Sequence, residues 1–344
     1  MNNIKKIGLS ALAGSLVAVS AHAGELSVTG GMTATYATKS GDSGTASDDH
    51  GRGFSTDTGI TFTGSAELDN GFTVSGFVTQ LEGMGAVSSS QMTIGMGSMG
   101  SLKINRVGGG AVNALDDKLP SAWEEASDNS AHDFVGEDIG SGNDDGAISY
   151  HLPELEYEGN TINIGLDYDP ASGVAAGGTG STQVQGLIGT GTGVAVQIGT
   201  AYGLNVYAGV DTVERHNTSD VAGSISKDVF NGTAGAAYTY GPVTVGYQQW
   251  YNDAGLGTHY ASDGTSIAFA VNENLSLSYA AIDETKYQAG VRSLTNIEAS
   301  MKAYNVAYSM GAIAIKAHHG KTDNADFTTT TSNDMTEISV SFAF

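Results

Sequence analysis

The chain has 344 residues, of which 49 are Gly, 15% are charged and none is Cys, and its acids outnumber its bases by 37 to 14. The formal charge of -23 excludes a basic nucleic-acid-binding surface, and the lack of Cys excludes disulfides and thiolate metal sites. The glycines follow no Gly-X-Y period, so a collagen triple helix is excluded as well.

The first 23 residues have the pattern of a secretory signal peptide. Two lysines precede a stretch of apolar and small residues over 7–20, and Ala21-His22-Ala23 forms a cleavage site of the A-x-A type. The apolar stretch is shorter than the ~20 residues that a membrane-spanning helix needs. We therefore expect residues 1–23 to be removed and residues 24–344 to form one domain.

The remaining chain alternates apolar residues with small or polar ones. Residues 204–210, for example, read Leu, Val, Ala and Val at every second position, with Asn, Tyr and Gly between them. Successive side chains of a strand point to opposite faces, so this pattern predicts strands with one apolar face. Sixteen stretches follow it, at 26–39, 55–69, 71–82, 90–97, 100–107, 146–152, 161–169, 183–200, 203–214, 228–240, 242–252, 264–272, 274–285, 297–310, 312–321 and 335–344.

The connections between these stretches alternate in length. Short ones rich in Gly and Asn predict hairpin turns at 69–71, 98–100, 202–203, 240–242, 272–274 and 310–311. Longer polar loops lie near 40–54, 108–145, 170–182, 215–227, 253–263, 286–296 and 322–334. Short and long connections should therefore lie at opposite ends of the strands, with 153–160 as a longer loop on the short side.

Three features favour a membrane barrel over a soluble sandwich. The apolar faces carry almost no charge, Tyr and Phe gather at strand ends, and the chain ends on Phe344 in phase with the apolar face. Lipid offers no partner for backbone groups, so a sheet in a membrane must close. Sixteen strands enclose room for water. We predict an all-β fold, a transmembrane antiparallel β-barrel of about 16 strands.

Together these features resemble the general porins of Gram-negative bacteria, in particular the acidic Rhodobacter-like porins of the alpha-proteobacterial type. The resemblance covers nearly the whole chain after residue 23, and the combined pattern carries it. It implies an outer-membrane homotrimer that passes ions and small hydrophilic solutes. It also implies that the barrel-assembly machinery reads the C-terminal strand, with Phe342 and Phe344 as the assembly signal, and that the long third loop folds into the lumen.

Residues 108–145 are the longest interruption, and they contain ten acids and one base, Lys118. By the resemblance, this segment is the constriction loop. Carboxylates in a narrow lumen favour cations and repel anions. A solvated acidic surface loop is the alternative. Ser121 to Glu124 fit a capping box, which predicts a short helix beginning there. Our candidate constriction residues are Asp116, Asp117, Glu124, Glu125, Asp128 and Asp133.

The resemblance also implies a basic wall opposite the acidic loop. Lys103 and Lys316 are in phase with the polar face of their strands, whereas Arg106 shares its phase with apolar Ile104 but ends its strand. We take these three as the candidate wall. Because removal of two signal-peptide lysines would leave only 14 − 2 = 12 bases, the alternative is that they are ordinary strand-end charges.

No motif indicates an enzyme or a resident cofactor. The G-x-G-x-x-G match at 95–100 precedes a strand rather than a helix, so we interpret it as a turn. Asp48-Asp49 and Asp144-Asp145 could donate oxygens to Ca²⁺, but no EF-hand spacing occurs. An outer-membrane adhesin or enzyme built on a barrel remains the main alternative to a channel, and a glycine-rich solenoid is a third.

Overall fold

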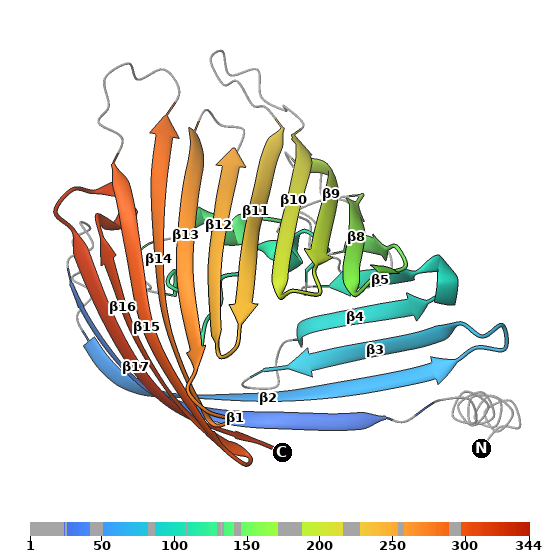
Figure 1. The fold of residues 1–344 in the computed structure, drawn as a ribbon, viewed down its shortest axis with the longest axis horizontal. Helices are drawn as coiled ribbons and strands as arrows, with labels where there is room; N and C mark the ends of the chain where they lie inside the picture. Colours follow the sequence, from blue (N-terminus) through green and yellow to red (C-terminus); the bar gives the residue numbers. More distant parts are fainter. Residues whose placement is uncertain are drawn as a thin grey trace, which may run out of the picture.

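The strands form one antiparallel sheet that closes on itself, because β1 pairs with both β2 and β17 (Figure 1). The computed structural model describes residues 24, 26–41, 51–81, 87–106, 109–128, 132, 134–140, 146–170, 188–215, 228–253, 258–288 and 297–344. The signal-peptide segment 1–23 lies outside these residues, and its cleavage stays a prediction.

The closed sheet runs through the strands in chain order. They are β1 (Ser27–Gly41), β2 (Gly51–Glu67), β3 (Thr73–Gln80), β4 (Val87–Gly95), β5 (Ser101–Arg106), β6 (Ile148–His151), β7 (Leu155–Tyr157), β8 (Asn160–Asp169), β9 (Ile188–Gly199), β10 (Leu204–Arg215), β11 (Val229–Tyr240), β12 (Val243–Asp253), β13 (Thr258–Ala270), β14 (Leu275–Gln288), β15 (Glu298–Met310), β16 (Ile313–Asp323) and β17 (Ser332–Ala343).

Sixteen positions around the barrel are occupied by these 17 strands. β6 pairs with the second half of β8 and β7 pairs with its beginning, so the two short strands share one position. The predicted loop over 153–160 is therefore wrong for Leu155–Tyr157, which form β7. A tight turn at Glu158 and Gly159, with φ of 49° and 77°, lets β7 fold straight back onto β8. The predicted strand number of about 16 is confirmed.

Every predicted stretch contains a strand, but several strands extend further at the long-loop end. β13 begins at Thr258, whereas the apolar pattern begins at 264, and β2 begins at Gly51 rather than 55. At these ends the backbone remains paired although the outward residues are polar. His259 and Asp263 on β13 are examples. Strand pairing requires only backbone hydrogen bonds, whereas the apolar pattern requires contact with lipid. A strand can therefore extend beyond its apolar segment.

The short turns depend on residues that accept a positive φ. Gly71, Gly203, Gly241 and Gly311 have φ values of 79°, 87°, 58° and 62°, as the predicted hairpins require. At 272–274 an Asn side chain provides the turn instead, because Asn272 Oδ1 accepts the N–H groups of Asn274 and Leu275 at 2.9 and 3.0 Å.

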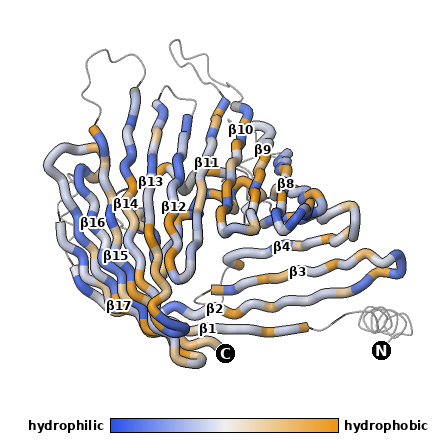
Figure 2. The backbone as a smooth tube through the Cα atoms, viewed as in Figure 1, coloured by the Kyte–Doolittle hydropathy of each residue, from blue (hydrophilic) through white to orange (hydrophobic). Residues whose placement is uncertain are grey.

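Hydrophobic and hydrophilic residues alternate along the strands (Figure 2). The two faces of the sheet differ accordingly. On β10, Val206 and Val210 are exposed on the outside, whereas Tyr207 and Asp211 are buried on the inside. Tyr and Phe side chains are exposed at strand ends, including Tyr168, Tyr238, Tyr240, Tyr308 and Phe344. No helix of the described residues is long and apolar enough to cross a membrane.

Charge on the outer face is more frequent than predicted. Asp263, Lys302 and Lys321 are in phase with outward Ile267, Tyr304 and Ile315 on β13, β15 and β16. All three lie in the halves of their strands nearer the long loops. In a barrel that spans a membrane, a charge costs least near the ends of the strands.

Candidate functional site

Part of the long connection between β5 and β6 lies inside the barrel (Figure 1). We call its described residues, 109–128, 132 and 134–140, the internal loop. Its backbone is hydrogen-bonded to inward side chains of β8, β10, β12, β14 and β15. Two 3-10 helices, Asn113–Leu115 and Val135–Asp138, are its regular elements.

The entry of the internal loop is fixed by Asp167 on β8. The carboxylate accepts the N–H groups of Ala111 at 2.8 Å and Val112 at 2.9 Å. A Cβ atom at Gly110 would lie 2.6 Å from Asp167 Oδ2, so this approach of backbone to carboxylate requires glycine. Hydrogen bonds to a charged group contribute about 1.5–3 kcal/mol each, and here two converge on one side chain.

The middle of the internal loop is fixed by β12. Gln248 donates from Nε2 to the carbonyl oxygen of Leu115 at 2.7 Å and accepts the N–H of Lys118 at 2.9 Å. Trp250 Nε1 donates to the carbonyl oxygen of Asp116 at 2.6 Å. Leu115 is fully buried between loop and wall, and burial of such a side chain contributes about 1.5–3 kcal/mol.

The predicted helix at Ser121 is not formed. Ser121 Oγ donates to the carbonyl oxygen of Glu124 at 2.8 Å, which makes a turn instead. The wall holds this turn in place, because Ser278 Oγ accepts the N–H of Ala122 at 2.9 Å and Asn305 Nδ2 donates to Glu124 O at 2.7 Å. These side-chain bonds take up backbone groups that a helix would have used.

The returning half of the internal loop meets two more inward carboxylates. Gly140 donates its N–H to Asp211 on β10 at 2.9 Å, and His132 Nε2 lies 2.8 Å from Glu284 Oε2 on β14. Sequence analysis missed the wall residues that hold the loop, which in the described part of the chain include Asp167, Asp211, Gln248, Glu284 and Asn305. One signal was available: each is a polar residue in phase with the inward face of its strand.

Five of the six candidate constriction residues lie in described parts of this loop, whereas Asp133 lies outside the described residues. Asp116, Asp117, Glu125 and Asp128 line a recess of about 610 Å³ together with Lys118. Glu124 is hydrogen-bonded to Asp128 and interacts electrostatically with Glu337 of β17 and Lys316 of β16.

Burial changes the acidity of these carboxyl groups. It raises the pKa of Asp116 and of Asp117, and hydrogen bonds, including one with Glu125, oppose the rise at Asp117. The pKa of Glu124 is raised to about 7 by burial, by a hydrogen bond with Asp128 and by the negative charges of Asp128 and Glu337. Of these groups, Glu124 therefore titrates near neutral pH.

The two candidate basic residues with described side chains, Lys103 and Lys316, lie on separate strands, β5 and β16. Lys316 Nζ lies 5.7 Å from the centre of the Trp123 ring and so lies beside Glu124, on the side of the acids. Lys103 faces inward on β5, next to His151. The side chain of Arg106 lies outside the described residues.

The described residues contain no group of three or more His, Cys, Asp or Glu side chains that could hold a metal ion. The two pairs of aspartates that we named as candidate Ca²⁺ ligands, at 48–49 and 144–145, lie outside the described residues. The prediction about Ca²⁺ thus stays untested.

Comparison with known proteins agrees with the fold. The family model of Gram-negative porins matches residues 8–344. OmpF of Salmonella typhi, solved in complex with daunomycin, is 13% identical with a TM-score of 0.67, over 93% of this chain and 97% of that one. The anion-selective porin of Comamonas acidovorans is 14% identical with a TM-score of 0.62, over 93% and 99% of the two chains.

A mutant of the Rhodobacter blastica porin is 15% identical with a TM-score of 0.56, over 93% of this chain and all of that one. At these identities the structures share the fold. No curated protein matches the chain.

Proposed function

Because the chain belongs to the Gram-negative porin family, we propose that it forms a water-filled channel for passive diffusion across the outer membrane. Its solutes are ions and small hydrophilic molecules, and it prefers cations. Residues 1–23 direct the chain through the inner membrane and are removed. The channel has no chemical step and needs no cofactor.

The observation that supports cation preference is the acidic internal loop docked on the inner wall. Four carboxyl groups at 116–128 line one recess with Lys118, and the fifth, that of Glu124, is hydrogen-bonded to Asp128 and interacts with Lys316. In a narrow lumen with low-dielectric walls, this excess of negative charge raises the local concentration of cations. The fold alone does not determine selectivity, because one of the similar structures is an anion-selective porin.

The experiment is planar-bilayer conductance of the purified protein across a KCl gradient. We expect ohmic steps and a reversal potential of the sign that cation selectivity gives. Conductance steps without ion selectivity would support the proposed channel but contradict the proposed role of the loop carboxylates. A folded barrel that gives no conductance would contradict the channel and favour the adhesin or enzyme alternative.

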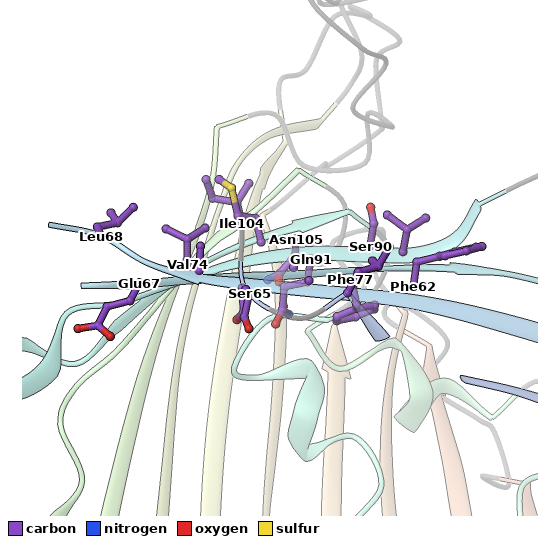
Figure 3. A pocket seen from close by; sticks show the side chains of 18 of the residues that line it. Phe62, Ser65, Glu67, Leu68, Val74, Phe77, Ser90, Gln91, Ile104 and Asn105 are labelled. Carbon is purple, nitrogen blue, oxygen red and sulfur yellow. Dashed lines mark hydrogen bonds between the residues drawn. The ribbon is translucent and has the colours of Figure 1, made fainter. Parts of the chain in front are cut away.

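We also propose that the protein is a homotrimer whose contacts include the outer face of β2–β5. A groove of about 1270 Å³ crosses this face (Figure 3). Leu68, Val74 and Ile104 point to the lipid side, whereas Glu67 and Ser65 point to the lumen (Figure 3). Gly64 and Gly76 form the floor. Lipid chains pack poorly in such a hollow, whereas the apolar side chains of a second copy fit it.

The C-terminal strand completes the barrel, and we propose that the barrel-assembly machinery recognises it. Gly30 and Phe344 exchange two backbone hydrogen bonds, at 2.8 and 2.9 Å, at the seam between β1 and β17. The rings of Phe342 and Phe344 lie side by side, 5.9 Å apart, on the outer face. They are thus accessible before the barrel meets lipid.

A further inference from the structure

The connection between β16 and β17 is held in an unfavourable backbone conformation. We call residues 324–331 the strap. Asn324, Asp326, Phe327 and Thr330 have φ values of 55°, 51°, 56° and 77°, although none is glycine. Side chains with a Cβ seldom adopt this region, and they stay there only when surrounding contacts hold them. The contacts that hold the strap therefore decide its conformation.

One contact joins the strap to the internal loop. The N–H of Asp326 donates to Nδ1 of His132 at 3.1 Å, across 194 positions of sequence. The ring of Phe327 packs edge-on against the His132 ring, with 5.0 Å between ring centres. Ala325, next to Asp326 in the strap, is fully buried. On its other side the strap is joined to β15, where Asn324 Nδ2 donates to Glu298 O at 2.9 Å.

These bonds determine where His132 carries its proton. Nδ1 accepts a hydrogen bond and so must be unprotonated, which leaves the proton on Nε2. Nε2 donates it to Glu284 Oε2 at 2.8 Å. Glu284 also accepts the N–H of Val135 and the hydroxyl of Ser262, both at 3.2 Å. The imidazole is thus neutral, and both of its nitrogens are occupied.

A second proton on the His132 ring would break the hydrogen bond with Asp326 and keep the hydrogen bond with Glu284. The imidazolium would donate from both nitrogens, so Nδ1–H would face the N–H of Asp326 and could not accept it. The buried Glu284 carboxylate would remain paired with the positive ring. Histidine is the side chain that most readily changes charge between about pH 5 and 8.

We propose that His132 is an acid-sensitive latch that holds the strap against the internal loop, and that protonation of His132 releases the strap. The strained backbone of the strap favours release once the acceptor is lost. In the described residues the charged groups around the latch are Glu284 and Lys286 of β14 and Asp326 of the strap itself. Lys286 lies over the rings of Tyr260 and Phe327, at 5.6 and 5.4 Å from their centres, and repels the new charge.

The absence of Cys makes the latch testable by thiol labelling of the intact protein. In Ala325→Cys the single thiol lies at a buried position of the strap, whereas in Thr329→Cys it lies at an exposed position of the strap. The labelling rate of the thiol at residue 325 is divided by the labelling rate of the thiol at residue 329. Because all thiols react more slowly in acid, this ratio corrects for the effect of pH on the labelling chemistry. We expect this ratio to rise about tenfold between pH 7.5 and pH 5.5. A constant ratio would overturn the proposal.

Two substitutions separate the latch from a general loosening by acid, each made in the Ala325→Cys background. His132→Gln can still reach Glu284 but offers no acceptor at the Nδ1 position, so the buried thiol should react fast at both pH values. His132→Asn keeps an acceptor near the position of Nδ1, and this acceptor does not titrate. The buried thiol should therefore react slowly at both pH values. Slow labelling of the Gln variant at neutral pH would contradict the latch. Heat-modifiable gel mobility checks that each barrel is folded.

This labelling requires no ion flow and therefore does not depend on the proposed channel function. A channel that conducts while the ratio stays constant would overturn the latch alone. A ratio that rises in a barrel without conductance would support the latch and overturn the channel.

Discussion

The carboxylate of Asp167 accepts the backbone N–H of Val112 at 2.9 Å, and its other oxygen accepts the neighbouring N–H of Ala111. This one side chain thus fixes the point where the internal loop leaves β5 and turns along the inner wall. Val112 itself is fully buried there. The position of the loop in the lumen depends on inward polar residues of the wall as well as on the loop.

The variant Asp167→Ala should release the beginning of the internal loop. Two buried N–H groups would lose their acceptor, at a cost of about 1–3 kcal/mol each. We expect larger fluctuations of the open-channel current in bilayer recordings, with the barrel still folded. Asn163→Ala is the matched control, because Asn163 lies on the same face of β8 and bonds Glu154 rather than the loop. Equal noise in both variants would contradict the anchoring role.

Cation preference should depend on pH through Glu124. Its pKa of about 7 means that the group is neutral in mild acid and negative above neutrality. We therefore expect cation selectivity, measured as a reversal potential, to increase between about pH 6 and pH 8. In Glu124→Gln this part of the increase should disappear. A wild-type reversal potential that is flat over this range would show that Glu124 does not act on the ions.

The same shift has a consequence for stability. The folded chain binds the Glu124 proton more tightly than the unfolded chain, so the contribution of this group is greatest below the unfolded pKa. It is lost as pH rises through about 7. Docking of the internal loop should therefore weaken, not strengthen, on ionisation of Glu124.

Neutralising four loop carboxylates should reduce cation preference. The variant carries Asn at 116 and 117 and Gln at 124 and 125. We expect the permeability ratio of K⁺ to Cl⁻ to fall about threefold or more, because the local potential loses the negative charge that these four groups carry. The control replaces the same number of acids in the short turns and in β7, which are Asp69, Glu156, Glu158 and Glu273. If both variants shift the reversal potential alike, the loop has no special role.

Deleting Phe344 should impair assembly of the barrel. It removes the last pair of backbone hydrogen bonds at the β1–β17 seam and the ring that covers Gly30. The fraction of heat-modifiable protein in the outer-membrane fraction measures the effect. Phe344→Ala keeps the backbone pair and separates the ring from the seam. Normal assembly of the deletion would mean that the terminal aromatic only packs against lipid.

Filling the outer groove should prevent association of protomers without closing the channel. Nothing lies within 4 Å of a Cβ atom placed at Gly64, so Gly64→Trp fits the isolated barrel and occupies the groove. We expect a loss of the trimer in size-exclusion chromatography with light scattering. Thr265→Trp on the exposed outer face of β13 is the control. A trimer that survives Gly64→Trp would place the contact elsewhere.

The amino-acid sequence by itself determined the strands, their faces and the turns. Side chains of a strand alternate between two faces, so a period of two is visible without a structure. Asn and Gly at 69–71 and 272–274 marked the turns because only a few residue types accept their backbone angles. Lipid on one side and water on the other then required the sheet to close, and the strand number followed from counting the alternating stretches.

Only the tertiary structure decided what holds the internal loop. Asp167 meets Ala111, Gln248 meets Leu115, and His132 meets both Glu284 and Asp326, because closure of the barrel aligns strands that lie far apart in sequence. The same contacts replaced the helix expected at Ser121 by a turn. The local sequence pattern indicates which face of the sheet a side chain is on. A hydrogen bond also requires that the two residues lie at the same level along the barrel axis and on facing strands, and the closed sheet determines both.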